Sequence, residues 1–326
     1  MRLPFIDGFM LAMLGAIALA LLAPQYGLDS GPLHLDAITT WGVALVFFLS
    51  GIGLSPAKLR AGAANWRLHL FVQLSCFALF PLIGLVAVLS LAKVLPRDLL
   101  IGFFYLCVLP STVSTSIAMT ALARGNLAGA IFNATLSSLL GIVLTPLFIS
   151  LWLQTAGGEV SPLAQLGKLT QQLLLPFALG QLLRPLIGDR LARYKSITTK
   201  IDRSVIVLIV YHSFCEATAA GVWTRYGAQP LLLTIVLTGA LLVLVLTTTR
   251  SAARALRFNT EDEIAAVFCG SKKSLAVGAP MAALIFGASG GALGLIMLPL
   301  IVYHQLQLVV CSTIAQRYAA RSSDKN

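Results

Sequence analysis

Long apolar stretches, separated by short polar connections, make up nearly the whole of this 326-residue chain. A helix needs ~20 mostly apolar residues to cross the hydrocarbon core of a membrane. Ten stretches qualify, at residues 6–23, 36–54, 68–92, 98–123, 127–153, 167–186, 202–221, 230–250, 262–286 and 292–316. No soluble domain of any size fits between them. The pattern therefore predicts an all-α membrane protein with ten transmembrane helices in one integral membrane domain.

Two of these stretches carry polar residues near their middle. The fourth contains LPSTVSTSIAM (109–119), with Pro110 ahead of five hydroxyl residues, and the ninth contains FCGSKKSLAVGAP (268–280), with Lys272 and Lys273 at its centre. Proline removes a helix donor and glycine lowers helix stability, so the backbone can unwind at both places. Unwound backbone at membrane depth persists only where protein or a water-filled cavity satisfies it. We therefore expect two broken helices that face each other across a central site.

The two segments also correspond when the chain is aligned with itself at an offset of 162 residues, the separation of Cys107 and Cys269. At this offset the fourth span falls on the ninth, and ten spans divide into five plus five. An odd number of spans per repeat gives the halves opposite topology, and inverted repeats of this kind are typical of secondary transporters, with the site near the midplane. The prediction is a first five-helix repeat at 1–156 and a second, inverted repeat at 157–326. The other matched pairs are Met119 with Met281, Leu122 with Leu284, Gly125 with Gly287, Gly129 with Gly291, and Ala130 with Ala292.

Charged residues are few and unevenly placed. They make up 11% of the chain, while 58% of its residues are hydrophobic; soluble proteins carry about 25% charged residues. With both termini in the cytoplasm, the 23 lysines and arginines divide into 17 in cytoplasmic connections, two in the ninth span, and four outside, at Lys93, Arg97, Lys168 and Arg225. Such a bias sets the orientation of membrane helices. The net charge of +11 therefore orients the protein, and we expect cytoplasmic termini and no nucleic-acid partner.

The N-terminal span has features of a signal peptide, with Arg2, an apolar run and small residues near its end. Asp7 interrupts the charged region, however, and the repeat requires this segment as a helix. We therefore expect the segment to remain as the first span.

Lys272 and Lys273 stand where a charge is costly. If the ninth span begins near Asp262, Lys272 lies ten residues in, or ~15 Å at 1.5 Å per residue, which is half of a ~30 Å core. A charge there costs at least ~2.5–3.5 kcal/mol. The lysines are either structural charges, paired or capped by carbonyls, or cations of a transport site, and we favour the second interpretation. A desolvated lysine can also titrate near neutral pH and release a proton during transport. Adjacent helical residues point ~100° apart, so we expect Lys272 in the site and Lys273 in a role that holds the crossover together.

Other polar residues within the spans are weaker candidates for substrate or ion contacts. Hydroxyls often bond only their own helix backbone, and amides often join neighbouring helices, so structural interpretations stay open for all of them. Glu216 is an acidic residue well inside a span, where it fits an interfacial position, a counter-ion or a proton carrier. The full set of these candidates is Gln73, Thr112, Ser114, Ser116, Asn133, Thr135, Glu216, Ser271 and Ser274.

No feature of the sequence indicates an enzyme, a cofactor or a metal site. The five cysteines, at positions 76, 107, 215, 269 and 311, lie inside predicted spans without C-x-x-C spacing, so we expect packed, free thiols. His212, His304 and Gln305 are expected to be packed or interfacial, and none of the four histidines has metal-ligand spacing. The motifs H-E-x-x-H and G-x-S-x-G at a strand–helix elbow, and paired aspartates within spans, are absent.

The polar segments carry a family resemblance. LPSTVSTSIAMTALARGN (109–126), followed by an apolar span ending in LTP (144–146), resembles the fourth and fifth spans of the bile acid:sodium symporter superfamily. GSKKSLAVGAP (270–280) is similar to a divergent, lysine-containing branch that includes the seventh human member and its bacterial relatives. The resemblance covers essentially the whole chain. It implies ten helices in two inverted five-helix repeats, with crossing broken fourth and ninth helices.

The resemblance also implies where sodium ligands would stand, and most of those positions are changed. Sodium needs several oxygen ligands and an anionic group. Here one ligand position keeps its oxygen and an ammonium occupies another, so sodium sites of the usual kind are not expected and Lys272 is expected to replace sodium as a built-in cation. The family's ligand positions fall on Phe268 and Lys272 of the ninth helix, Ser116 and Ile117 of the fourth, Ala130 and Ala134 of the fifth, and near Cys76 of the third, one turn from Gln73.

Together these observations predict a secondary active transporter of a small organic anion or amphipathic solute. It would work by alternating access and be uncoupled or proton-coupled rather than strictly sodium-coupled. A sodium-coupled, bile-acid-like symporter is one alternative. A non-transporting regulator of cellular calcium or ion homeostasis is another, because the resembled branch has members linked to calcium control. We expect a monomer in the bilayer of the cell (inner) membrane, without a cofactor.

Overall fold

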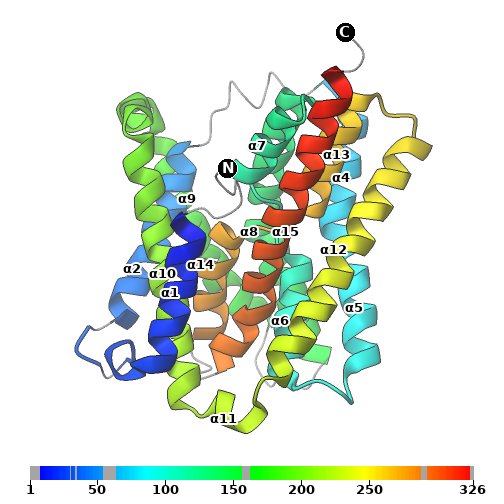
Figure 1. Cartoon of the computed structure of the whole chain (residues 1–326). Helices are drawn as coiled ribbons and strands as arrows, with labels where there is room; N and C mark the ends of the chain where they lie inside the picture. Colours follow the sequence, from blue (N-terminus) through cyan, green and yellow to red (C-terminus); the bar gives the residue numbers. More distant parts are fainter. Residues whose placement is uncertain are drawn as a thin grey trace.

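The computed structural model of the chain describes residues 8–29, 31–33, 35–53, 64–155, 162–287 and 292–323. Within these ranges the regular structure is entirely helical, and each predicted span contains helix, with short non-helical segments inside the fourth and the ninth (Figure 1). Some features used in the predictions lie outside the described residues. They include Arg2, Lys58 and Arg60, which are predicted to be cytoplasmic, the boundary between the predicted repeats at 156–157, and Gly291 of the repeat alignment.

The helices follow one another with short connections. The first half contains α1 (Gly8–Leu22), a 3-10 turn (Pro24–Tyr26), α2 (Leu35–Gly53), α4 (Trp66–Leu74), a π-helical segment (Ser75–Leu79) continuing into α5 (Phe80–Leu91), α6 (Arg97–Val108), α7 (Ser114–Leu122) and α8 (Leu127–Thr155). The second half contains α9 (Pro162–Arg193), α10 (Lys195–Ala219), α11 (Val222–Tyr226), α12 (Gln229–Ala255), α13 (Thr260–Ser271), α14 (Leu275–Phe286) and α15 (Ala292–Ser323).

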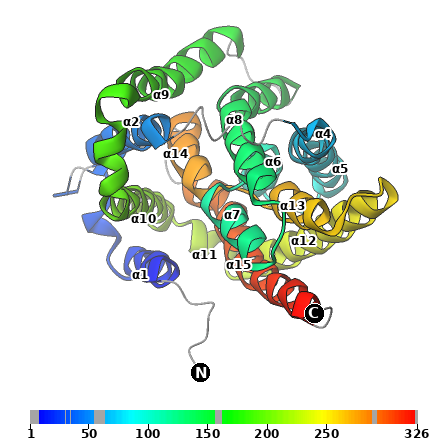
Figure 2. The same cartoon turned by 90° about the horizontal axis from the view of Figure 1, so that it is seen from above.

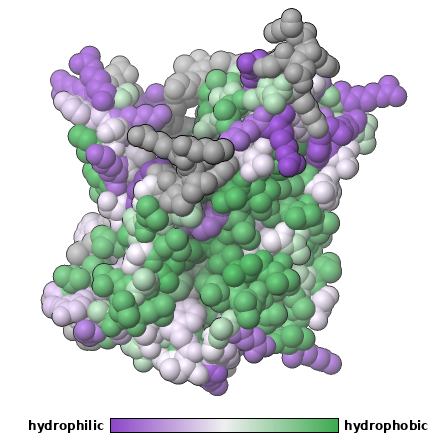
Figure 3. All heavy atoms as spheres, viewed as in Figure 1, coloured by the Kyte–Doolittle hydropathy of each residue, from purple (hydrophilic) through white to green (hydrophobic). Residues whose placement is uncertain are grey.

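Length and hydropathy single out the helices that can cross a membrane unaided. Among the described residues, four continuous helices are long and apolar enough, at Trp66–Leu91, Leu127–Trp152, Gln229–Ala255 and Ala292–Ala320. Apolar side chains cover the middle of the face shown in Figure 3, and hydrophilic side chains gather toward its two ends. Large apolar side chains such as Leu89 on α5 and Val236 on α12 are likewise exposed. An exposed apolar surface of this extent has the character of a surface in contact with lipid.

Seen from above, the helices form two groups (Figure 2). Helices α1, α2, α9 and α10 lie along one side, where α2 packs on α9 and α1 on α10. Helices α4 to α8, α12, α13 and α15 form the larger group, and α14 contacts both α15 and the helices α2, α9 and α10. Gly51 lets α2 approach α9 closely, because a Cβ at this position would clash with the backbone carbonyl of Phe177 on α9.

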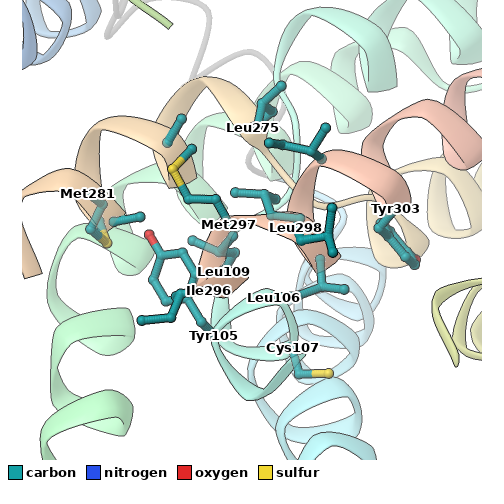
Figure 4. Close-up of a cluster of buried hydrophobic side chains, with 14 of the residues drawn as sticks. Tyr105, Leu106, Cys107, Leu109, Leu275, Met281, Ile296, Met297, Leu298 and Tyr303 are labelled. Carbon is teal, nitrogen blue, oxygen red and sulfur yellow. The ribbon is translucent and has the colours of Figure 1, made fainter. Parts of the chain in front are cut away.

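The interior of the larger group is apolar and is built largely from α6, α14 and α15. A glycine brings α6 onto α15, since a Cβ at Gly102 would clash with the backbone carbonyl of Ile296. This packing fixes the end of α6, where the chain leaves the helix. The side chains of this cluster in Figure 4 include Tyr105, Leu106, Cys107, Leu109, Leu275, Met281, Ile296, Met297, Leu298 and Tyr303.

Three helices run well beyond their predicted spans. Helix α9 continues to Arg193, although the predicted span ends at residue 186, α10 begins at Lys195 instead of 202, and α15 continues to Ser323 instead of 316. A hydropathy window marks where a segment stops being apolar, whereas leucine, arginine, lysine and isoleucine can continue a helix into water. The predicted spans are therefore contained within longer helices on this side of the molecule.

Candidate functional site

The two polar segments are the places where helices break. Helix α6 ends at Val108 and α7 begins at Ser114, while α13 ends at Ser271 and α14 begins at Leu275. The first residue of each break is extended, with ψ of 154° at Leu109 and 151° at Lys272. The breaks also touch, because the backbone N–H of Ser274 donates to the carbonyl of Pro110 at 2.9 Å. The structure thus brings the two polar interruptions together.

Breaking a helix leaves carbonyl groups without helical partners, and side chains of neighbouring helices supply the missing donors. Residues of the first break and of α7 donate to the end of α13, while α8 and α15 supply donors to the ends of α6 and α13. These contacts hold the crossover in one arrangement. They are Ser111 Oγ to the carbonyl of Cys269 (2.7 Å), Ser116 Oγ to Phe268 (3.2 Å), Thr145 Oγ1 to Val108 (2.7 Å) and Tyr303 OH to Ser271 (2.6 Å).

Lys273 is completely buried and bonded to the backbone. Its ammonium group donates to the carbonyls of Leu109 at 2.6 Å, Cys107 at 2.8 Å and Cys76 at 3.1 Å. An ammonium group has three donors, so these three carbonyls use them all. The charge also lies 3.9 Å from the ring centroid of Phe80. Lys273 therefore joins α6, its break and the π-helical segment to the second break.

The π-helical segment explains why the Cys76 carbonyl is open to Lys273. In this segment the N–H of Phe80 donates to the carbonyl of Ser75, five residues back. The next donor in the same register would belong to Pro81, and proline has no N–H. The Cys76 carbonyl is thus left for the ammonium of Lys273. Single π-helical turns occur frequently at functional sites.

Lys272 is also completely buried, but its surroundings differ. Its ammonium group donates to the backbone carbonyl of Thr115 at 2.9 Å and lies 5.4 Å from the ring centroid of Phe268. Within the described residues, one hydrogen bond is recorded for its three donors, and the ion pairs join other residues. Lys272 is therefore a buried cation with unused donor capacity, whereas its neighbour is saturated.

The hydroxyl candidates divide between the crossover and local roles. Thr112 Oγ1 lies 2.9 Å from Ser116 Oγ, which in turn bonds the Phe268 carbonyl of the other broken helix. Ser114 is exposed. Ser271 donates to its own helix at Val267, and Ser274 accepts the N–H of Val277 as the N-cap of α14. Of these residues, Thr112 and Ser116 lie at the contact between the breaks.

The amide candidates form a separate pair between α4 and α8. Gln73 Nε2 lies 3.2 Å from Asn133 Oδ1 and 3.3 Å from the Asn133 carbonyl, and Asn133 Nδ2 donates to the carbonyl of Gly129. The Oε1 atom of Gln73 is buried without a hydrogen-bond partner. Thr135 is buried on α8. This pair joins two helices beside the crossover.

Glu216 lies at the far end of α10, away from the recorded contacts of either lysine. Its Oε1 atom accepts the backbone N–H of Asp29 at 3.0 Å. Within the described residues, no ion pair joins Glu216 to Lys272 or Lys273. Glu216 thus contacts the connection after α1, and its role as interfacial residue, counter-ion or proton carrier stays a prediction.

Two residues of α15 at the crossover escaped the sequence analysis. Gln307 bonds the backbone of Lys273 twice, accepting its N–H and donating to its carbonyl, both at 2.9 Å. Tyr303, one turn earlier, caps Ser271 as described above. Tyr303 and Gln307 are four residues apart, and this i, i+4 spacing places both side chains on one face of α15. That spacing was the signal in the sequence. The neighbouring Gln305 points elsewhere, and its Nε2 atom lies 3.9 Å from the sulfur of Met13.

A polar cluster at the start of α13 fixes the direction in which the broken helix enters. Asn259 caps α13 by accepting the N–H of Asp262. The Asp262 carboxylate then accepts the side-chain amides of Asn65 at 2.8 Å and Asn126 at 2.7 Å. These asparagines cap α4 and α8 through Leu68 and Gly129. One carboxylate therefore ties together the N-termini of three helices.

Comparison with known proteins agrees with this architecture. Residues 7–320 match the SBF-like CPA transporter family. The chain is similar to "Putative symporter YfeH" of Escherichia coli (strain K12), with 44% identity over 96% of this chain and 93% of the relative. It is similar to "Uncharacterized protein PA2026" of Pseudomonas aeruginosa, with 43% identity over 98% and 94%. It is also similar to "Sodium/bile acid cotransporter 7" of Mus musculus, with 32% identity over 94% and 91%.

The protein is thus an integral membrane protein of the transporter class, and its substrate is a small molecule. The chain belongs to the SBF-like CPA transporter family, within the bile acid:sodium symporter superfamily. This confirms the resemblance drawn from the polar segments and the assignment to transporters rather than enzymes.

Proposed function

We propose that this protein is a secondary active transporter of a small organic anion or amphipathic anionic solute, and that Lys272 is the fixed positive charge of its substrate site. The observation that carries the proposal is the contrast between two adjacent buried lysines. Lys273 is saturated by three carbonyls, whereas Lys272 makes one hydrogen bond within the described residues. A buried charge without an opposite charge is costly. An anionic solute at Lys272 would offset that cost.

The same contacts favour a cycle that does not require sodium. Ser116, the ligand position that keeps its oxygen, donates to the carbonyl of Phe268, and the ammonium of Lys272 reaches the carbonyl of the preceding Thr115. A sodium ion at this place would meet an ammonium group instead of a carboxylate, and hard cations prefer anionic oxygen ligands. We therefore assign to Lys272 the part of a built-in cation, so that transport is uncoupled or proton-coupled.

Alternating access is supported by burial and by the grouping of the helices. The Lys272 side chain has 0% exposure, so a solute can reach it only after helices move. The group formed by α1, α2, α9 and α10 is the natural frame, because it packs on itself and meets the larger group mainly through α8, α14 and α15. The larger group, which carries both breaks, would rock or slide against this frame.

The arrangement of the helices also supports the finer architecture that we propose. At the offset of 162 residues, α1 and α2 correspond to α9 and α10, and the broken pair α6 and α7 corresponds to α13 and α14. Ten transmembrane helices in two inverted repeats account for this correspondence. The lysine and arginine bias supports cytoplasmic termini. We include in the proposal a monomer in the cell (inner) membrane, without a cofactor.

The first test is a thermal-shift screen of the purified protein in sodium chloride and in choline chloride. A ligand that binds the folded state raises the apparent stability according to its occupancy. The panel contains taurocholate, because relatives are named sodium/bile acid cotransporters, and smaller carboxylates and sulfonates. We expect an anion that stabilises the wild type in choline and fails to stabilise Lys272→Gln. Lys93→Gln, which removes an exposed lysine, is the matched control.

The stabilising anion is then used in uptake by proteoliposomes. Uptake that requires sodium in the wild type would contradict the built-in cation and favour the sodium-coupled symporter. Absence of any anion binding and of any uptake by the purified protein would contradict transport and favour a regulatory role.

A further inference from the structure

A histidine and two carboxylates meet at a place remote from the crossover. Asp29 lies in the connection between α1 and α2, while His212 and Glu216 lie one turn apart on α10. One ligand atom from each residue can be chosen so that the three lie within 4.8 Å of one another. The side chain of Asp29 is 68% exposed and that of His212 is 13% exposed. An ion from solution can therefore reach the cluster through Asp29, while the mostly buried His212 is fixed by its surroundings.

The orientation of His212 is the informative feature of this cluster. Its Nδ1 atom lies 2.8 Å from the backbone carbonyl of Gly27. A carbonyl only accepts hydrogen bonds, so Nδ1 carries a proton. The other ring nitrogen, Nε2, faces Asp29 Oδ1 at 3.5 Å. In a neutral imidazole that nitrogen holds a lone pair, and a cation between this lone pair and the carboxylate would be attracted to both.

That cation is either a second proton or a metal ion, and the second carboxylate favours the metal. Metal-bound histidines commonly donate their other N–H to a backbone carbonyl, which fixes the tautomer, as the Gly27 carbonyl does for His212. A single imidazolium would leave one of the two carboxylates unbalanced, whereas a divalent ion balances both. Glu216 is already drawn to the cluster, since its Oε1 atom accepts the backbone N–H of Asp29 at 3.0 Å.

The distances agree with a small four-coordinate ion. Zinc–nitrogen and zinc–oxygen bonds of about 2.0–2.2 Å place two ligands of a tetrahedral ion about 3.4 Å apart. The separation of His212 Nε2 and Asp29 Oδ1 is 3.5 Å. Glu216 completes the set by a change of side-chain rotamer within the 4.8 Å limit. A nitrogen ligand together with carboxylates suits a transition metal better than calcium or magnesium.

We propose that Asp29, His212 and Glu216 form a binding site for a divalent transition-metal ion, represented by Zn²⁺, with water as the fourth ligand. The ion would link the α1–α2 connection to the end of α10. Tyr211 OH of α10 already donates to the carbonyl of Ala23 at 3.3 Å in this region. Local motifs could not reveal this site, because Asp29 and Glu216 are 187 residues apart in sequence. The site is independent of Lys272, since its contacts lie within the helix group α1, α2, α9 and α10.

The test is a Zn²⁺ titration of the purified, chelator-treated full-length protein by calorimetry, together with thermal unfolding with and without ZnCl₂. We expect saturable binding of one ion per chain and a rise in apparent Tm that EDTA reverses. Asp29→Asn, His212→Gln and Glu216→Gln should each weaken the affinity at least about tenfold. Glu261→Gln, which removes an exposed carboxylate from α13, should leave it unchanged.

A second measurement keeps the result decisive if a variant folds poorly. Co²⁺ bound to the wild type should give the intense visible d–d absorption of a four-coordinate ion, and Zn²⁺ should displace it. Absence of saturable Zn²⁺ binding, equal affinity in the three site variants and Glu261→Gln, or an unchanged aqueous Co²⁺ spectrum would overturn the proposal. In each of those cases the cluster is a contact between the α1–α2 connection and α10 that holds no metal ion.

Discussion

Adjacent lysines with different partners allow a sharp comparison of Lys273→Met with Lys272→Met. Methionine keeps an unbranched, flexible side chain that is one atom shorter than lysine, and it removes the charge. In Lys273→Met, three hydrogen bonds to carbonyls are lost. Interhelical hydrogen bonds in membrane proteins contribute about 0.6–1.7 kcal/mol each, so the free energy of unfolding should fall by about 2–5 kcal/mol. Three buried carbonyls left without donors move the value toward the upper end.

Lys272→Met should behave differently. One hydrogen bond, to Thr115, is lost, and removal of a buried charge without a carboxylate partner offsets this loss. The free energy of unfolding should therefore change by less than about 1 kcal/mol, although transport should be abolished. Stability and activity are thus expected to separate between neighbouring positions.

Thermal unfolding of the purified variants, followed by tryptophan fluorescence at one scan rate, measures the difference. A change of 1 kcal/mol shifts Tm by roughly 2–4 °C, so Lys273→Met should unfold roughly 4–20 °C below the wild type and Lys272→Met within a few degrees of it. The scan rate is kept constant because membrane proteins often unfold irreversibly. Equal Tm values for the wild type and Lys273→Met, or an equal loss in both variants, would refute the assignment of Lys273 to structure and Lys272 to the site.

Two further substitutions test the packing that positions the breaks. Gly102→Ala should lower the free energy of unfolding by about 1–3 kcal/mol, because the new Cβ meets the backbone of α15. Gly239→Ala, where no atom lies within 4 Å of the new Cβ, is the control and should be neutral or stabilising. Equal Tm values for the two variants would contradict the close packing of α6 on α15. Asp262→Ala should cost about 1–3 kcal/mol by leaving the amides of Asn65 and Asn126 without their acceptor. A Tm of Asp262→Ala equal to that of the wild type would show that this carboxylate does not hold the helix ends.

The breaks and the buried lysines could be predicted because polar and helix-breaking residues stand out within apolar membrane-spanning stretches. Proline, glycine and two lysines in the middle of apolar stretches are costly there, so they mark places where backbone is unwound and charge is compensated. The different geometries of Lys272 and Lys273 also followed from their adjacency in the chain. Whether Lys272 contacts a solute remains a prediction.

The partners of the lysines could not be predicted in the same way. The ammonium of Lys273 meets Cys76 across 197 residues of sequence, and this contact depends on a π-helical register created next to Pro81. Hydropathy is the same for an α-helix and a π-helix. Gln307 and Tyr303 reach the crossover because α15 packs against it, and such packing has no local signal in the sequence beyond their common face.

The position of Glu216 shows the same limit. Its depth within an apolar stretch left interfacial, counter-ion and proton-carrier roles open. Its hydrogen-bond partner lies in the connection after α1, where Asp29 approaches α10. Contacts made by connections between helices depend on tertiary packing, and the one-dimensional pattern carries little information about them.

The most direct test is uptake of the stabilising anion by proteoliposomes in sodium-free buffer over a range of pH. We expect uptake by the wild type that persists without sodium and disappears in Lys272→Gln. Uptake that appears only when sodium is added, or uptake that Lys272→Gln retains at full size, would contradict a buried ammonium group as the cation of the transport site.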